Sequence, residues 1–174
     1  MKRHETLQPL SREHQKGLVL AKRLRDSSGG SGQERDRALA AFTHAWNREL
    51  MGHFADEERI VGPLVSLEMR SRLLAEHAEL RTLAAQAAEP GAALNPAFVE
   101  KVGRTLHDHI RWEERELFEA AQETAPDALD ALHPVIDDIH ARRPGSRPYD
   151  PEAGCEVGGR EEEAGSSDDA TSTP

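Results

Sequence analysis

The sequence predicts an all-α fold: an up-and-down four-helix bundle with a short fifth helix and a disordered acidic C-terminal tail. Apolar residues recur at steps of three and four up to about His140, which is the pattern of amphipathic helices. No stretch shows the sustained two-residue alternation and β-branched enrichment of a strand. Clusters of Gly, Pro, Ser and Asn interrupt the helical pattern and divide it into segments.

The first two helices are separated by a flexible break. Ser11 resembles an N-cap, which predicts a first helix over about residues 11–26. The segment SSGGSGQ at 27–33 ends that helix. A second helix is expected over about residues 34–61, and Gly62-Pro63 stops it.

Further caps divide the rest of the helical region. Ser66 can cap a third helix over about residues 67–88. Asn95 and Pro96 form a cap and first-turn pair that opens a fourth helix, which reaches about Glu123. A shorter fifth helix is expected over about residues 126–140.

The acidic charge is concentrated at the C-terminal end. The chain has 174 residues and a formal net charge of −10 at pH 7, and residues 144–174 hold eight acids and two bases. This Pro-, Gly- and Ser-rich segment cannot bury enough apolar surface to order itself. We therefore expect one helical domain over residues 1–143 and a disordered tail over residues 144–174.

The composition excludes several classes of function. An acidic body has no electrostatic reason to bind nucleic acid or an anionic membrane. No apolar run approaches the ~20 residues that span a bilayer, and the N-terminus lacks the apolar region of a signal peptide. A single cysteine, Cys155, rules out an intramolecular disulfide and disfavours a cysteine-based zinc site. We expect a soluble cytoplasmic protein, and the sequence does not indicate a protein partner.

Two H-x-x-x-E motifs, His53 to Glu57 and His109 to Glu113, are the strongest chemical signal. Residues four apart lie on one helix face, so each motif can present an imidazole and a carboxylate to the same ion. Each motif lies on a different long helix and interrupts an apolar stripe. An ionised carboxylate in such a stripe is costly unless a cation pairs with it.

The other two helices each add one histidine to the inward face. His14 and His77 lie within the stripes of the first and third helices. The four predicted stripes contain these apolar residues: Leu10, Leu18 (or Gly17), Ala21 and Leu24; Leu39, Phe42, Trp46, Leu50, Ile60 and Leu64; Leu73, Leu80 and Ala84; Phe98, Val102, Leu106 and Leu117. Four histidines and two glutamates therefore face one another inside the predicted bundle.

This donor set predicts a site for two metal ions. Four histidines supply two nitrogens per ion, and two glutamates can each bridge both ions, which gives about four protein donors per ion. Such a mixed set suits redox iron or manganese, whereas structural zinc more often has a closed cysteine/histidine set. The alternative is an inert core of His–Glu ion pairs, which would leave His14 and His77 without a reason to lie at the same depth.

Without a cation, we expect Glu57 and Glu113 to repel each other or to take up protons with raised pKa values. The metal should then contribute strongly to stability. We expect four more glutamates to face outward or to support the ligands: Glu49, Glu58, Glu76 and Glu114. The remaining histidines are interpreted as surface or packing residues: His4, His44, His107, His133 and His140.

The series His14, His53-x-x-x-Glu57, His77, His109-x-x-x-Glu113 resembles the hemerythrin family of HHE cation-binding domains. The segment HFADEERIVGPL matches the family's HF-x-x-E-E followed by Pro, and the similarity spans roughly residues 4–140. The resemblance implies a hemerythrin-like bundle with two non-haem iron ions, for which manganese is an alternative. It also implies that Glu57 and Glu113 bridge the ions, and that dioxygen, peroxide or nitric oxide binds at an open position.

One departure from the oxygen-carrying hemerythrins bears on function. Those proteins have a fifth histidine one turn from another on the third helix, whereas Leu73 and Arg81 lie one turn from His77 here. One iron then lacks a protein ligand, which disfavours simple reversible oxygen storage. Three functions stay open: binding or sensing of a small ligand, a di-iron oxidase or peroxidase with true turnover, and iron storage or delivery. The sequence does not decide whether the protein is an enzyme.

Overall fold

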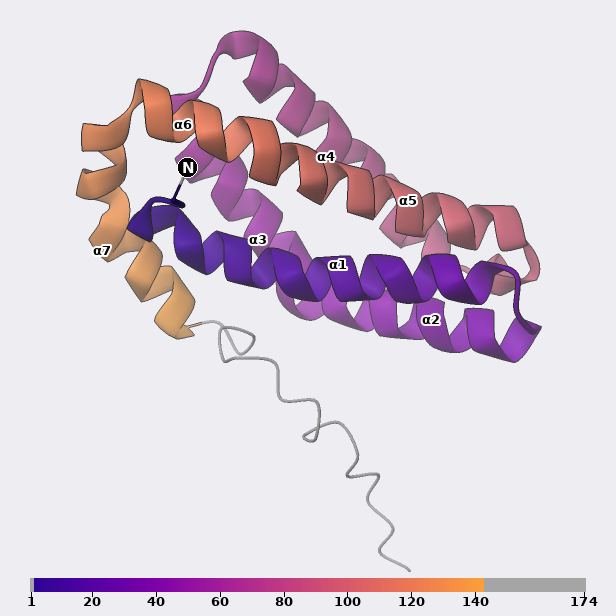
Figure 1. Ribbon diagram of the computed structural model, residues 1–174. Coiled ribbons are helices and arrows are strands. Elements are labelled where there is room, and N and C mark those ends of the chain that lie inside the picture. Colours follow the sequence, from indigo (N-terminus) through magenta and orange to yellow (C-terminus); the bar gives the residue numbers. More distant parts are fainter. Residues whose placement is uncertain (1, 143–174) are drawn as a thin grey trace, which may run out of the picture.

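The computed structural model describes residues 2–142, and over this range the chain is a series of helices joined by short turns (Figure 1). No strand occurs among these residues, as the sequence predicts. The predicted tail, residues 144–174, lies outside the described residues. Within residues 2–142, no helix combines the length and the hydropathy that a bilayer crossing requires.

Four long helices run up and down the bundle (Figure 1). The first is α1 (Gln8–Ser28), and the third is α4 (Leu67–Ala87). The second is continuous and consists of α2 (Gly32–Ala45), η2 (Trp46–Leu50), α3 (Met51–Asp56) and η3 (Glu57–Val61), followed by the 3-10 turn η4 (Gly62–Leu64). After the short turn η5 (Ala92–Leu94), the fourth consists of α5 (Pro96–Trp112), η6 (Glu113–Leu117) and α6 (Phe118–Thr124).

Most helix starts follow the predicted caps. Ser31 and Glu34 form a capping box at α2, Ser66 caps α4, and Asn95 caps α5. The prediction for α1 is wrong, because Ser11 lies inside the helix. A 3-10 turn, η1 (Glu5–Leu7), leads directly into α1, and the His4 side chain caps it by accepting a hydrogen bond from the Thr6 backbone N–H.

The predicted fifth helix is present as α7 (Pro126–Arg142). It turns back across one end of the bundle and lies beside the N-terminal turn η1 (Figure 1). The Thr6 hydroxyl, which is buried, donates a hydrogen bond of 2.9 Å to the Leu129 carbonyl oxygen. This contact fastens the start of the chain to α7.

Three segments of the long helices, η2, η3 and η6, are π-helical. In each, a backbone N–H binds the carbonyl five residues earlier: Met51 to Trp46, Gly62 to Glu57, and Phe118 to Glu113. A π turn inserts one residue into the α-helical repeat and rotates the residues that follow. For this reason Gly62, five residues after Glu57, is buried, whereas Leu64, predicted for the core, lies in the 3-10 turn η4 and is only partly buried.

Close packing of α1 against α5 depends on two glycines. A Cβ atom on Gly103 would lie 2.8 Å from the Ala21 carbonyl oxygen, and one on Gly17 would lie 2.5 Å from Ile110 Cδ1. Both distances are too short for a real contact, so a side chain at either position would push the helices apart or move a neighbour. Gly17, rather than Leu18, is the buried residue of the predicted stripe.

The apolar core consists of two separate clusters. The larger cluster lies toward the α1–α2 turn and includes Leu24, Phe42, Leu80 and Leu106. The smaller lies toward α7 and includes Leu10, Leu73, Leu117, Phe118 and Leu129. Phe98, which was predicted for the core stripe, is only partly buried, and Val99 occupies the core instead. On each long helix, the inward histidine stands between the residues of one cluster and those of the other.

Candidate metal centre

The six inward residues predicted from the sequence meet at one level of the bundle. All six side chains are buried. His14, His53 and Glu57 form one group of donor atoms within 4.8 Å of one another, and a second group consists of His77, His109 and Glu113. The structure thus brings together every residue of the predicted set.

Glu57 faces both groups of histidines. Its Oε1 atom lies 3.1 Å from His14 Nε2 and 3.2 Å from His53 Nε2. Its Oε2 atom lies 3.7 Å from His77 Nε2. The carboxylate therefore presents one oxygen to each group.

Glu113 spans the same two groups from the opposite helix. Its Oε2 atom lies 3.2 Å from His14 Nε2. Its Oε1 atom lies 3.1 Å from His109 Nε2 and 3.5 Å from His77 Nε2. The Nε2 atoms of His77 and His109 are 3.0 Å apart, so one of them donates a hydrogen to the other.

The outward ring nitrogen of each histidine donates a hydrogen bond to a further glutamate. The Nδ1 distances are 2.6 Å from His14 to Glu114, 2.6 Å from His53 to Glu13, 2.8 Å from His77 to Glu58 and 2.8 Å from His109 to Glu76. A carboxylate on Nδ1 fixes the ring orientation and leaves Nε2 to face the centre, which is the usual arrangement behind metal-bound histidine.

These outer glutamates connect the four long helices in a closed cycle. Glu13 on α1 serves the histidine of α3, and Glu58 on η3 serves that of α4. Glu76 on α4 serves the histidine of α5, and Glu114 on η6 serves that of α1. Every helix thus orients the inward histidine of a neighbouring helix, which sets the helices in register at this level.

Three of the outer glutamates also accept hydrogen bonds from arginines. Arg3 donates to Glu114 at 2.8 Å, Arg81 to Glu58 at 2.6 Å, and Arg72 to Glu76 at 2.6 Å. Arg, Glu and His therefore form a chain from the surface to the centre at each of these positions. At Glu114 burial acts to raise the pKa, but the contact and charge of His14, with a smaller contribution from Arg3, lower it to about 2.

The two central glutamates stay ionised in the absence of a metal, contrary to the sequence-based expectation of repulsion or raised pKa. Burial and the charge of Glu113 act to raise the pKa of Glu57, but the neighbouring His53 and His14 lower it below 4.5. Burial acts in the same way on Glu113, but the charge and contact of His109 hold its pKa well below 4.5. The expectation overlooked the capacity of the histidines to take up the protons.

The pKa values of three inward histidines are raised, whereas those of the central glutamates are lowered. Burial acts to lower the pKa of His14, but contacts with Glu113 and Glu114 raise it well above 6.5. At His53 burial also acts to lower the pKa, but the charge of Glu57 acts to raise it, and the pKa of His53 is raised. The charge of Glu113 outweighs burial at His109 and raises its pKa to about 9. Protons therefore occupy the centre when no other cation does.

The donor atoms suit a metal better than they suit one another. Four inward atoms have neighbours within contact range but lack the alignment of a hydrogen bond: His53 Nε2, Glu57 Oε2 and both carboxylate oxygens of Glu113. Buried polar atoms without hydrogen bonds are rare and costly. A cation between each pair of imidazoles would satisfy all four atoms, so the residues present are chemically suited to two metal ions.

Aromatic rings enclose the centre. Phe54 stacks on His77 with ring centroids 4.2 Å apart, and Phe118 stacks on His14 at 5.3 Å. These rings restrict rotation of the imidazoles and keep bulk water away from the charged atoms. The geometry is that of a preorganised, enclosed set of nitrogen and oxygen donors.

Comparison with known protein families agrees with this geometry. The family model of the hemerythrin HHE cation-binding domain matches residues 6–121 and so includes all six inward residues. The chain belongs to this hemerythrin family. No curated protein and no solved structure matched the chain.

Three of the four glutamates named from the sequence lie behind the inward histidines of this hemerythrin domain, and the fourth does not. Glu58, Glu76 and Glu114 bind inward histidines, whereas Glu49 lies 3.4 Å from Lys16, away from the centre. Glu13 was not predicted from the sequence. A signal for it exists, because on each long helix an acid lies directly beside an inward histidine or glutamate: Glu13-His14, Glu57-Glu58, Glu76-His77 and Glu113-Glu114.

The other positions discussed from the sequence lie outside the hemerythrin centre. His44 is exposed, His107 pairs with Asp108, and His4 and His133 lie at the η1–α7 end. The side chain of His140 lies outside the described residues. Leu73 packs in the smaller apolar cluster, and Arg81 binds Glu58, so neither supplies a fifth donor.

Proposed function

We propose that this hemerythrin domain holds two non-haem iron ions and binds dioxygen, or a related ligand such as peroxide or nitric oxide, in sensing or redox chemistry. One observation carries the proposal. Four imidazole Nε2 atoms face two shared carboxylates, while the Nδ1 atom of every imidazole is engaged by an outer glutamate. The sequence match to a cation-binding family supports it.

The six residues divide evenly between two ions. His14 and His53 would hold one ion, and His77 and His109 the other, with one oxygen from each of Glu57 and Glu113 on both. Two nitrogens and two carboxylate oxygens per ion suit iron, with manganese as the alternative, better than structural zinc. Four protein donors leave coordination positions for an external ligand.

Iron would supply Lewis acidity and electrons for binding or reducing such a ligand. The protein's own contributions follow from the contacts described above. The outer glutamates hold the rings and their tautomers, the buried setting strengthens electrostatic interactions, and Phe54 and Phe118 limit the entry of water. Only a small ligand would fit such an enclosed centre.

Metal analysis after anaerobic reconstitution with iron tests the site. We expect about two ions per chain, because the donors form two equivalent groups. Glu57→Ala and Glu113→Ala should each lower the occupancy strongly, because each removes a donor shared by both groups. His44→Ala and Glu123→Ala change exposed residues and serve as controls. One ion or none in the unaltered chain would contradict the two-ion site.

Stopped-flow absorbance tests the ligand. The reduced, iron-loaded protein would be mixed separately with dioxygen, peroxide and nitric oxide. A stable adduct supports binding or sensing, whereas rapid decay with repeated consumption of the ligand identifies an enzyme. No spectral response to any of the three would overturn the proposed function while leaving the metal site intact.

A further inference from the structure

A positively charged groove opens on the surface next to the His109 side of the centre. It has a volume of about 420 Å³ and lies between α4 and the α5–η6 helix. Three arginines contribute to its walls, and the indole of Trp112 lies among them. The full lining is Arg72, His107, Asp108, Arg111, Trp112, Arg115 and Glu116.

The arginines of the groove have more positive charge than their neighbours neutralise. Among residues 2–142, neither Arg111 nor Arg115 forms an ion pair, although they lie one helical turn apart. Asp108 is engaged by His107 at 2.8 Å, and Glu116 lies 3.9 Å from Arg72 Nη1. The lining residues include three arginines and two acids, and Glu76, which pairs with Arg72 from outside the lining, is shared with His109. Arg111 and Arg115 therefore give the groove positive charge on a protein that is acidic overall.

Arg72 is held in place by contacts on two sides. Its guanidinium carbon lies 4.2 Å from the Trp112 ring centroid, in a cation–π contact, and its Nε donates to Glu76 at 2.6 Å. An immobilised guanidinium loses less entropy when it binds a further acceptor. Its free N–H groups can therefore act together with Arg111 and Arg115.

We propose that this groove binds a small oxyanion, and specifically a phosphate group, through Arg111 and Arg115 with Arg72 as the third contact. Guanidinium groups match the oxygens of phosphate in geometry and charge, and they stay protonated at any physiological pH. The occupant is small because Arg72 covers the Trp112 ring, which leaves no free aromatic face for stacking a base.

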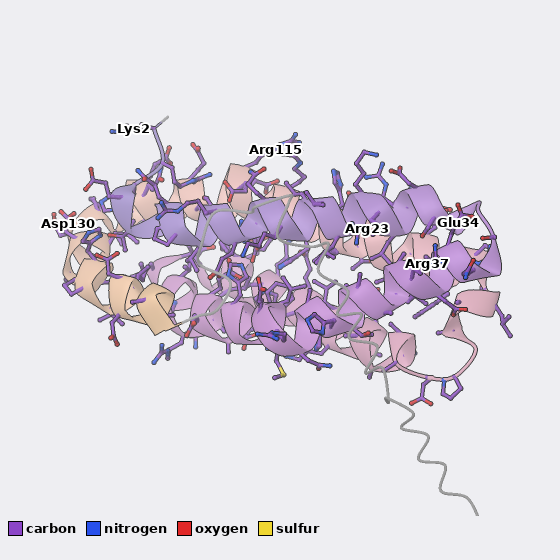
Figure 2. All side chains as sticks on the ribbon, turned by 90° about the horizontal axis from the view of Figure 1, so that it is seen from below. Lys2, Arg23, Glu34, Arg37, Arg115 and Asp130 are labelled. Carbon is purple, nitrogen blue, oxygen red and sulfur yellow. The ribbon has the colours of Figure 1, made fainter. Side chains whose placement is uncertain are left out.

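A second groove, with the same number of lining bases and acids, serves as the comparison for the proposal. It has a volume of about 450 Å³, lies between α1 and α2, and is also lined by basic residues, among them Arg23 and Arg37. It differs in arrangement: Lys22 pairs with Asp26, and none of its lining residues is an aromatic that could hold a guanidinium in place as Trp112 holds Arg72. Figure 2 shows Arg23, Glu34 and Arg37 near the α1–α2 end, well separated from Arg115.

Isothermal titration of the full chain with inorganic phosphate, at constant ionic strength, tests the proposal. The unaltered protein should bind one phosphate. The double variant R111Q/R115Q should bind it at least about tenfold more weakly, because it loses two charge-assisted contacts. All of these arginines are exposed, and melting temperatures would verify that the variants fold.

The control is the double variant R23Q/R37Q, which removes the same charge from the second groove and should leave phosphate binding unchanged. Equal weakening in both double variants would mean diffuse attraction and overturn the proposal, as would absent binding in the unaltered protein. Unchanged binding in R111Q/R115Q would place the phosphate elsewhere, the metal centre included. Adenosine monophosphate in a second titration distinguishes the free anion from a phosphate on a larger molecule. None of these outcomes depends on iron. A negative result for phosphate binding would therefore leave the proposed function at the metal centre untouched, and a negative result at the metal centre would leave the phosphate groove untouched.

Discussion

Each inward histidine is held at both ring nitrogens, and the two contacts have different roles. The Nε2 atoms meet the central carboxylates, while the Nδ1 atoms meet Glu13, Glu58, Glu76 and Glu114. A neutral imidazole with a hydrogen on Nδ1 offers its lone pair from Nε2. The outer glutamates therefore decide which nitrogen is available to a metal.

Removing one outer glutamate should weaken metal binding without removing a ligand. We expect Glu114→Ala to lower the iron affinity about 10- to 100-fold, the usual range for loss of a hydrogen-bonding partner behind a metal ligand. Glu114→Gln should have a smaller effect, because the amide oxygen still accepts the Nδ1 hydrogen. Competition with a chromogenic chelator measures the affinity, with Glu123→Ala as the control. An unchanged iron affinity in Glu114→Ala would show that the hydrogen bond from His14 to Glu114 is not needed to orient the His14 ring.

The protonation of the centre predicts how the stability of the metal-free protein depends on pH. The raised pKa values of His14, His53 and His109 add stability that is fully present below pH 6.5 and is lost as pH rises through the folded values, about 9 for His109. The lowered pKa values of Glu57 and Glu113 add stability that is present above pH 4.5 and is lost as pH falls.

The chelated protein should therefore melt highest between about pH 4.5 and 6.5, and the melting temperature should fall from pH 6.5 to 9. Metal ions must displace these protons, so the gain in melting temperature on adding iron should be larger at pH 8.5 than at pH 6. Thermal melts followed by circular dichroism measure both. A flat profile for the chelated protein would mean that the histidines do not hold the protons.

At the scale of the elements, each central glutamate is the first residue of a π segment. Glu57 opens η3 and Glu113 opens η6. The inserted residue brings the residue five positions after each glutamate, Gly62 or Phe118, onto the inward face, where both are buried. A uniform α-helix would turn these two residues about 140° away from the glutamates.

The sequence predicted the helices well because caps and apolar periodicity are local signals. Ser66 and Asn95 begin helices where predicted, and the SSGGSGQ break ends the first helix. The π segments were not predicted, because a search for a 3.6-residue period assumes that the helix is uniform. Ser11 was misplaced because Pro9 fits the first turn of a helix as well as it fits the segment before a cap.

The close approach of α1 and α5 predicts the cost of a methyl group at Gly103. We expect Gly103→Ala to reduce the free energy of unfolding by about 1–3 kcal/mol, because its Cβ would meet backbone and Cβ atoms of α1 below 3 Å. Gly17→Ala should cost less, since it meets the movable end of Ile110. Gly29→Ala, which meets nothing within 4 Å, is the control. Urea denaturation measures all three, and a fully stable Gly103→Ala would contradict the packing described.

At the scale of the whole molecule, the sequence predicted the meeting of six residues from four helices but not the cycle of glutamates around them. The six residues lie on inward stripes with helical spacing, so their depth in the bundle follows from the pattern. Glu13 lies about a quarter turn away from its stripe, and its partner His53 is on another helix. Contacts between neighbouring helices depend on relative rotation and height, which no single-helix pattern contains.

The polar layer between the two apolar clusters has a consequence for the exchange of backbone hydrogens with solvent. Between the clusters the packing consists mainly of charged side chains in place of apolar ones, so the metal-free protein should exchange as two cooperative units that open separately. Amides of α6, beside the smaller cluster, should then exchange faster than those in the middle of α5. Both ions would be held by residues whose helices contribute to both clusters, so opening either half would require releasing them. Mass spectrometry of iron-loaded protein in deuterated buffer should show the two halves exchanging at nearly the same, slower rate.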